Sequence, residues 1–136
     1  MTKAFWAGRS VLVTGGTGFS GSHLVEARGA AGSKLTATAS SESTKAKYLL
    51  PATKRVTWAV GDLSDLAVSR RAMRGVEVVM HLAAKVGGIA FNVAHPATIF
   101  KENLQSFMTV IEAARLEGVR RFLVTSSACV YPRDCA

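Results

Sequence analysis

Apolar residues gather in five short runs along the chain, and longer stretches of mixed character separate them. Runs of this length between amphipathic segments are typical of strands that are buried inside a sheet. The first run continues into glycines, and the second is the least apolar of the five. We therefore expect strands at Ser10–Gly16, Leu35–Ser40, Arg55–Asp62, Gly75–Ala84 and Arg120–Ser127.

The segments between these runs favour helices. Pro96–Glu117 is the clearest, because its apolar residues recur at helical spacing and Gly118 follows as a stop. Phe19–Ala31 is expected to form a helix after the first strand, and Ser64–Met73 opens with residues that suit a helix N-terminus. Ser41–Leu50 is ambiguous and favours one weak helix at most.

Strands that alternate with helices predict an α/β fold with a parallel sheet, right-handed crossovers and helices on both faces. Five strands in this pattern match the start of a doubly wound, Rossmann-type dinucleotide fold, in which the ligand lies across the carboxyl ends of the strands. Residues 1–136 are expected to be a single domain of this type, without the sixth strand.

A glycine-rich loop joins the first strand to its helix. The sequence TGGTGFSGSHL places Gly15, Gly18 and Gly21 three residues apart at this junction. Small residues there allow a tight turn, close approach of backbone N–H groups to a pyrophosphate, and close packing of helix on strand. The alternative is a glycine turn without a ligand, but the position between strand and helix favours a phosphate site.

The glycine loop begins a resemblance that later segments strengthen. VLVTGGTGFSGSHLVE resembles the start of the extended short-chain dehydrogenase/reductases, the NAD-dependent epimerase/dehydratase family. GDLSD at 61–65, HLAAKVGG at 81–88 and TSSACVYP at 125–132 resemble later segments of that family, in the expected order. The resemblance covers nearly the whole chain and implies a nicotinamide dinucleotide cofactor.

The resemblance also implies which residues contact the cofactor. The glycine loop would hold the pyrophosphate, Asp62 would contact the adenine, and the loop after the fourth strand would pass beside the cofactor. The inferred cofactor-binding residues are Gly15, Thr17, Gly18, Phe19, Ser20, Gly21, Ser40, Asp62, Leu63, Leu82, Ala83, Ala84, Lys85, Val124 and Thr125.

The identity of the dinucleotide depends on the end of the second strand. An acidic residue there would hold the ribose hydroxyls of NAD. That position falls near Ala39, where the sequence reads TASSES and the first carboxylate is Glu42. The cofactor is therefore expected to be NADP or NAD, with NADP favoured, its 2′-phosphate being met by Ser40, Ser41, Lys45 or Lys47.

The last segment carries the expected chemistry. The resemblance makes Ser127 the catalytic serine that hydrogen-bonds a substrate oxygen, and Cys129 an acid/base for epimerisation beside a sugar ketone. A thiol suits that step because its pKa lies closer to neutrality than that of a hydroxyl. The alternative for Cys129 is a small loop residue without a role, and this alternative is favoured for Cys135.

The substrate class comes from one longer segment. AAKVGGIAFNVAHPATIFKENL resembles the GDP-sugar members of the family, GDP-L-fucose synthase and GDP-mannose 3,5-epimerase. This likeness implies a nucleotide-sugar epimerase or reductase that acts on a GDP-linked sugar through a transient ketone. It also implies a homodimer for the full-length protein.

One part of the family's machinery is absent from the sequence. The family uses a Tyr-x-x-x-Lys pair, but Tyr131 is followed four positions later by Cys135. We therefore expect the pair and the sugar-binding part to lie beyond residue 136, and the 136 residues alone to be inactive. The competing hypothesis is a non-catalytic dinucleotide-binding or sensor module.

Charge and composition argue against nucleic acid, a membrane span and a metal as partners of the chain. The net charge is +8, but the basic residues are scattered and no aromatic-interleaved basic stripe occurs, so nucleic-acid binding is not expected. No apolar run is long enough for a membrane span, and two cysteines make no disulfide framework, so a cytoplasmic protein is expected. No metal site is expected.

Three further polar residues have alternative interpretations. His81 is flanked by apolar residues and is expected to be a core histidine rather than a catalytic one. Asn103 interrupts the apolar side of the long helix and is expected to brace the backbone of the site. Lys85 either reaches cofactor or substrate oxygens or is a solvated loop lysine.

Overall fold

The computed structural model of the chain describes residues 3–47, 56–127, 130–132 and 134. Strands and helices alternate, as the hydrophobic pattern predicts. The elements are α1 (Lys3–Trp6), β1 (Ser10–Thr14), α2 (Phe19–Ala30), β2 (Lys34–Ala39), α3 (Glu42–Lys47), β3 (Thr57–Val60), α4 (Leu66–Met73), β4 (Val78–His81), α5 (Gly88–Ala94), α6 (Pro96–Leu116) and β5 (Arg121–Val124).

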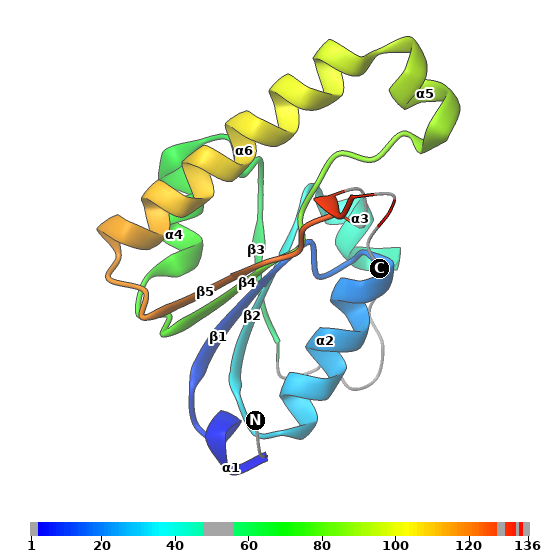
Figure 1. Ribbon diagram of the computed structural model, residues 1–136. Helices are drawn as coiled ribbons and strands as arrows, with labels where there is room; N and C mark the ends of the chain where they lie inside the picture. Colours follow the sequence, from blue (N-terminus) through cyan, green and yellow to red (C-terminus); the bar gives the residue numbers. More distant parts are fainter. Residues whose placement is uncertain (1–2, 48–55, 128–129, 133, 135–136) are drawn as a thin grey trace.

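The strands form one parallel sheet in the order β3-β2-β1-β4-β5 (Figure 1). This order confirms the expected Rossmann-type fold class, with five parallel strands. The chain winds outward from β1 through β2 to β3 and then crosses back to β4 on the other side of β1. The order therefore reverses between β1 and β4, and a crevice for a ligand forms at the carboxyl ends of the strands at such a reversal.

Side chains alternate between the two faces of the sheet, and each face has its own core. Val11 and Val13 of β1 pack with α1 and α2, in a cluster that includes Trp6 and Val25. Leu12 of β1 points the other way, into a cluster formed with α4 and α6. Figure 1 shows these helices on opposite sides of the sheet. The buried central strands explain the continuous apolar runs in the sequence.

Except for β2, which has the predicted six residues but begins one residue earlier, the strands are shorter than the runs that predicted them, because the ends of the runs leave the ladder. The first run includes two glycines, but β1 ends at Thr14 and Gly15 turns the chain with a φ of +66°. The fourth run, Gly75–Ala84, contributes only Val78–His81 to the sheet. The residues that follow the strands in these two runs, Gly15 and Gly16 after β1 and Leu82 to Ala84 after β4, lie at the carboxyl ends of the strands.

Two helices were not predicted from the sequence. The first is α5, which lies between β4 and α6 and contains no buried residue. Its apolar side chains Ile89 and Val93 are exposed. A helix of this length, with no apolar face against a core, leaves little periodic signal in the sequence.

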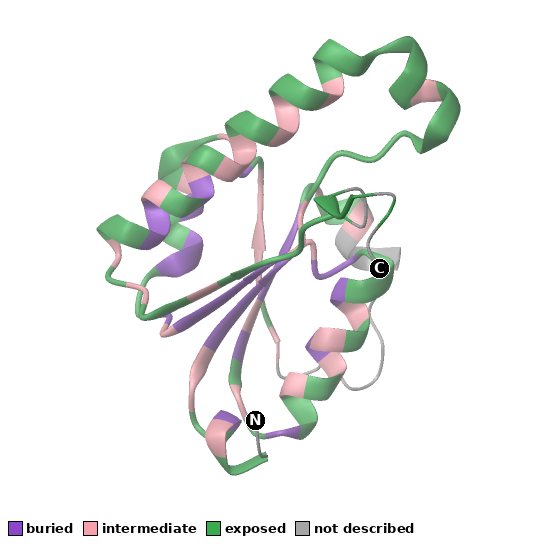
Figure 2. Cartoon of the chain, in the orientation of Figure 1, coloured by how far each residue is buried: buried purple, intermediate pink, exposed green. Residues whose placement is uncertain are grey.

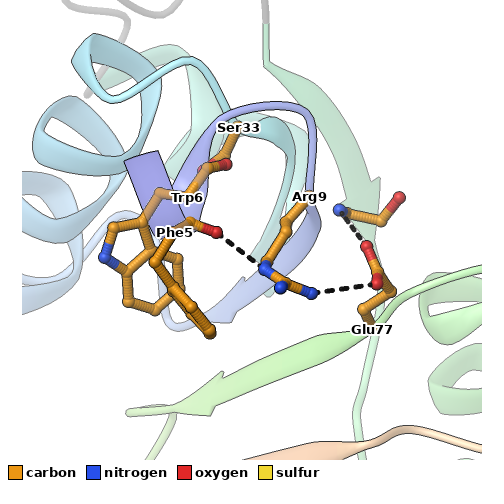
Figure 3. Close-up of polar contacts among 6 residues, drawn as sticks. Phe5, Trp6, Arg9, Ser33 and Glu77 are labelled. Atoms are coloured by element: carbon orange, nitrogen blue, oxygen red, sulfur yellow. Dashed lines mark hydrogen bonds and ion pairs between the residues drawn. The ribbon is translucent and has the colours of Figure 1, made fainter. Parts of the chain in front are cut away.

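The second is α1, a short helix that precedes the sheet. Two of its carbonyl groups accept from the side chains of Arg9 and Ser33, which Figure 3 shows beside the helix. The Arg9 guanidinium donates to the Phe5 carbonyl at 2.7 Å and pairs with Glu77 at 3.2 Å. The Ser33 hydroxyl donates to the Trp6 carbonyl at 3.0 Å. These bonds fasten the chain entry to the amino-terminal side of the sheet, away from the ligand crevice.

Apolar side chains remain exposed on the outer side of α6. Phe100, Leu104, Met108 and Ile111 recur at helical spacing on this surface. Figure 2 shows α5 and the first half of α6 largely exposed, and the buried residues of α6, Val110, Ala113 and Ala114, all lie in its second half. Among the helices of the described residues, none combines the length and the apolarity that a membrane span requires.

Candidate functional site

A pocket of about 1000 Å³ lies at the carboxyl ends of the strands. Its walls come from five places: the glycine loop with the start of α2, the ends of β2 and β3, the loop after β4, one side of α6, and the residue that follows β5. The lining residues are Gly15, Thr17, Gly18, Phe19, Ser20, Gly21, Ser40, Gly61, Asp62, Leu63, Ser64, Leu82, Ala83, Ala84, Lys85, Val86, Glu102, Asn103, Gln105, Ser106 and Thr125.

Two of the loop glycines are required by packing. Gly15 has a φ of +66°, and a Cβ on it would lie 2.9 Å from the Ala83 nitrogen. A Cβ on Gly21 would overlap the Gly15 carbonyl oxygen. Because each contact involves backbone atoms, a side chain at either position would force the loop or the helix to move.

The third glycine is not required in this way. Gly18 has φ −77° and ψ 170°, a conformation open to any residue. A Cβ there would have one protein atom within 4 Å, the Gly15 carbonyl oxygen at 3.3 Å. Gly18 also lines the pocket. The fold therefore tolerates a side chain at Gly18, whereas a ligand that approaches the loop backbone does not.

The start of α2 offers backbone N–H groups to the pocket. Gly18 is the N-cap and supplies no capping side chain, and the first turn carries no acidic residue. The N–H groups of Phe19, Ser20 and Gly21 have no carbonyl partner within the helix, because they precede its first internal bond, from Ser22 to Gly18. Unpaired amides and the helix dipole together favour an anion at this place.

The ends of β2 and β3 form the next wall. Ser40 lines the pocket directly after β2, and no acidic residue of β2 lines it. The Ser41 hydroxyl lies 2.8 Å from the Thr44 hydroxyl and accepts from the Thr44 amide at 3.2 Å, which orders the start of α3. After β3, Asp62 accepts from the Ser64 amide at 2.8 Å, and this bond holds the pKa of its carboxyl below the usual value.

The loop after β4 is fastened to α6 by two side chains. The Asn103 amide accepts from the Lys85 backbone N–H at 2.6 Å and donates to the Lys85 carbonyl at 3.0 Å. Asn103 therefore braces the loop backbone, as expected from the sequence. The Lys85 ammonium pairs with Glu102 at 2.5 Å. Lys85 is thus an exposed loop residue that also lines the pocket, and its contact with cofactor or substrate oxygens stays a prediction.

The pocket brings together fourteen of the fifteen residues that the sequence indicated for the cofactor; Val124 does not line it. Contact of these residues with a cofactor stays a prediction. The sequence analysis did not assign Gly61, Ser64, Val86, Glu102, Gln105 or Ser106 to the site. A signal for part of this set was present, since Glu102 and Ser106 are four residues apart and therefore lie on the same side of α6.

The predicted reactive segment is described only in part. Ser127 is exposed and lies beyond the end of β5, outside the pocket lining. The Val130 amide donates to the Ser127 carbonyl oxygen at 3.2 Å. Cys129 and Cys135 lie outside the described residues, so the structure says nothing of their roles. Within residues 3–47, 56–127, 130–132 and 134, no three His, Cys, Asp or Glu side chains gather as they would around a metal ion.

Comparison with known proteins gives concordant results. The profile of the NAD dependent epimerase/dehydratase family matches residues 11–136. The chain is 33% identical over 135 residues to a dTDP-4-dehydro-6-deoxy-D-allose reductase from a Streptomyces species, covering 96% of this chain and 41% of the relative. It is 31% identical to GDP-mannose 3,5-epimerase 1 of Oryza sativa subsp. japonica, covering 90% of this chain and 32% of that protein.

Solved structures agree with these relatives. The chain superimposes on the epimerase Mth375 of Methanothermobacter thermautotrophicus with a TM-score of 0.80 and 32% identity, covering 97% of this chain and 39% of that structure. The chain thus spans about two fifths of the length of the first relatives that it matches.

Proposed function

Since the chain belongs to the NAD dependent epimerase/dehydratase family, we propose that its pocket holds the dinucleotide cofactor of a nucleotide-sugar epimerase or reductase. In this proposal the 136 residues form the cofactor-binding part of a longer enzyme. The relatives support this, because they include a dTDP-sugar reductase and a GDP-mannose epimerase and are more than twice as long.

The observation that carries the proposal is the open backbone at Gly18. Two glycines of the loop are explained by packing, but Gly18 has little protein around it and lines the pocket beside the unpaired amides of α2. A pyrophosphate binds such a loop by accepting hydrogen bonds from its backbone N–H groups. It therefore needs the space beside these amides that a Cβ on Gly18 would occupy. The residues present therefore fit a dinucleotide, with its pyrophosphate at the start of α2.

NADP is the dinucleotide that we propose. NAD-binding members of such folds place a carboxylate at the end of β2, where it accepts from the ribose hydroxyls and repels a 2′-phosphate. This chain has Ser40 at that end, and the acidic residues that line the pocket, Asp62 and Glu102, come from other walls. A serine hydroxyl can donate to a phosphate without charge repulsion.

The nicotinamide would supply hydride exchange with a sugar carbon. The 136 residues would hold the cofactor during this reaction. They would also supply Ser127, whose hydroxyl is proposed to hydrogen-bond the substrate oxygen. Cys129 is proposed to move a proton beside the sugar ketone. General acid–base assistance is worth about 10²–10⁴ in rate, so without a Tyr-x-x-x-Lys pair the 136 residues alone should show no turnover.

The proposed substrate is a GDP-linked sugar. Support comes from the segment between β4 and α6, which resembles GDP-sugar enzymes, and from the GDP-mannose epimerase among the relatives. The main alternative substrate is a dTDP-linked sugar, because the relatives also include a dTDP-sugar reductase. A turnover assay of the longer protein with GDP-, dTDP- and UDP-sugars distinguishes them, and a preference of at least about tenfold for a dTDP- or UDP-sugar would overturn this choice.

We also propose that the longer protein is a homodimer. The stripe formed by Phe100, Leu104, Met108 and Ile111 on α6 supports this, because an exposed apolar row along a helix can pair with the same row of a second copy. Sedimentation of the longer protein and of its Leu104→Glu variant tests the proposal. A wild-type monomer, or a variant that stays dimeric, would count against it.

The binding proposal is tested directly on this chain by calorimetric titration with NADP and NAD. Saturable binding of either supports the site, and at least tenfold tighter binding of NADP supports the choice of dinucleotide. Tighter binding of NAD would overturn that choice while leaving the site intact. A folded chain that binds neither would overturn the site.

A further inference from the structure

A buried hydroxyl lies where three walls of the pocket meet. Thr14, the last residue of β1, is 0% exposed, and its hydroxyl oxygen accepts from the amides of Leu82 and Ala83, each at 3.1 Å. The same oxygen lies 2.8 Å from Nδ1 of His81, which is 4% exposed. The His81 carbonyl in turn accepts from the Thr125 amide at 3.1 Å.

This arrangement fixes the proton positions. A hydroxyl oxygen has two lone pairs and one hydrogen. Both lone pairs are used by the two amides, so the hydrogen must point at His81. Nδ1 therefore has to accept, and His81 has to be neutral with its proton on Nε2. The ring packs beside Phe107 of α6 and Phe122 of β5, with centroids 5.9 and 6.0 Å away.

The two amides also mark where the chain leaves the sheet. Successive N–H groups of a regular strand point to opposite sides, whereas those of Leu82 and Ala83 converge on one oxygen. The chain must turn at this point, and the turn places Ala83 against the glycine loop. A Cβ on Gly15 would lie 2.9 Å from the Ala83 nitrogen. The Thr14 hydroxyl therefore sets the distance between two walls of the pocket.

We infer that Thr14 and His81 are positioning residues of the pocket: neutral His81 aims the Thr14 hydroxyl, which holds Leu82 and Ala83 against the glycine loop. A proton on Nδ1 of His81 would displace the Thr14 hydrogen and face an oxygen that already accepts twice. One of the amides would then have to leave. The pocket wall is thus predicted to loosen when His81 is protonated.

The surroundings of His81 agree with a neutral ring. Among the described residues, the ring contacts Thr14 of β1, Phe107 of α6 and Phe122 of β5, and none of these three carries a charge. Burial lowers the pKa of the His81 imidazole for the same reason. The neutral form therefore predominates near neutral pH, and loosening is expected only on acidification.

The first test needs no ligand. Nitrogen NMR of ¹⁵N-histidine-labelled chain should show an unprotonated Nδ1 and a protonated Nε2 for His81, while exposed His23 and His95 serve as internal references. Thr14→Val, which keeps the shape and removes the hydroxyl, should speed amide exchange at Leu82 and Ala83 by at least about tenfold. A protonated Nδ1 in the wild type, or unchanged exchange in the variant, overturns the inference.

The second test measures the affinity of the pocket for NADP, and it rests on the proposed function. Thr14→Val should weaken NADP binding by about tenfold through the lost hydrogen bonds. Thr14→Ser keeps the hydroxyl and should bind NADP with an affinity close to that of the wild type. Wild-type affinity in a folded Thr14→Val chain would overturn the inference. If the wild type bound no dinucleotide, the proposed function would fail, and the NMR and exchange results would still decide the role of Thr14.

The third test uses pH. Because burial lowers the pKa of the His81 imidazole from its usual 6.5, wild-type affinity for NADP should fall only as the pH is lowered below 6.5. His81→Asn places an amide oxygen near the Nδ1 position, where it accepts from Thr14 and does not titrate. Its affinity should therefore depend less on pH than that of the wild type. Equal pH profiles for the two proteins would overturn the role of His81.

Discussion

Gly18→Val separates the fold from the proposed site more sharply than any other change in the glycine loop. Gly18 has an unstrained φ of −77°, and a Cβ there would meet only the Gly15 carbonyl oxygen, at 3.3 Å. A shift of a few tenths of an ångström relieves that contact. Glycine is a better N-cap than valine, so the free energy of unfolding should fall by about 1 kcal/mol.

The effect on binding should be much larger. A side chain at Gly18 would hold a pyrophosphate away from the amides at the start of α2. Hydrogen bonds to charged groups contribute about 1.5–3 kcal/mol each, so losing two of them costs about 3–6 kcal/mol. This corresponds to a loss of about 10²–10⁴ in affinity. Stability and affinity should therefore change by very different amounts.

The measurement pairs calorimetric titration with a thermal unfolding curve for each variant. Gly29→Val is the matched control, because Gly29 lies on the same helix, a Cβ there has nothing within 4 Å, and it does not line the pocket. Its affinity should equal that of the wild type, with stability unchanged or slightly higher. Wild-type affinity in a folded Gly18→Val chain would refute the assignment of the pyrophosphate to this loop.

Four further outcomes are expected. Gly21→Ala should lower the free energy of unfolding by roughly 1–3 kcal/mol, because its methyl overlaps the Gly15 carbonyl oxygen, and an unchanged melting curve would contradict that packing. Asn103→Leu should cost about 0.5–1.5 kcal/mol, because two exposed hydrogen bonds to the Lys85 backbone are replaced by bonds to water, and the Lys85 amide should exchange faster. In the longer protein, Cys129→Ser should suppress deuterium uptake beside the sugar ketone while reduction of an already epimerised ketone survives; wild-type exchange would leave this cysteine without a role. Because burial lowers the pKa of His81, the unfolded chain binds more protons in the acid range, so the free energy of unfolding should fall as the pH drops below 6.5, and less so in His81→Asn.

The sequence by itself determined the fold class and most of the pocket. Five apolar runs alternating with helices leave few arrangements other than a parallel sheet, because only that sheet buries both faces of its strands. The glycine spacing predicted an anion site at the start of α2. This prediction needed only local sequence, because the tight turn from strand to helix and the close approach of its backbone both require small residues. Asn103 was also foreseen, because an amide on an apolar helix side needs partners.

Only the tertiary structure decided how distant segments meet. It showed that Gly15 and Gly21 serve packing while Gly18 is open, a distinction that depends on atoms of Ala83, sixty-eight positions from Gly15. It paired Lys85 with Glu102 and joined Thr14 to His81 across neighbouring strands. These partners lie far apart in the chain, and no local pattern records them, because strand register and helix placement bring them together only after the sheet has formed.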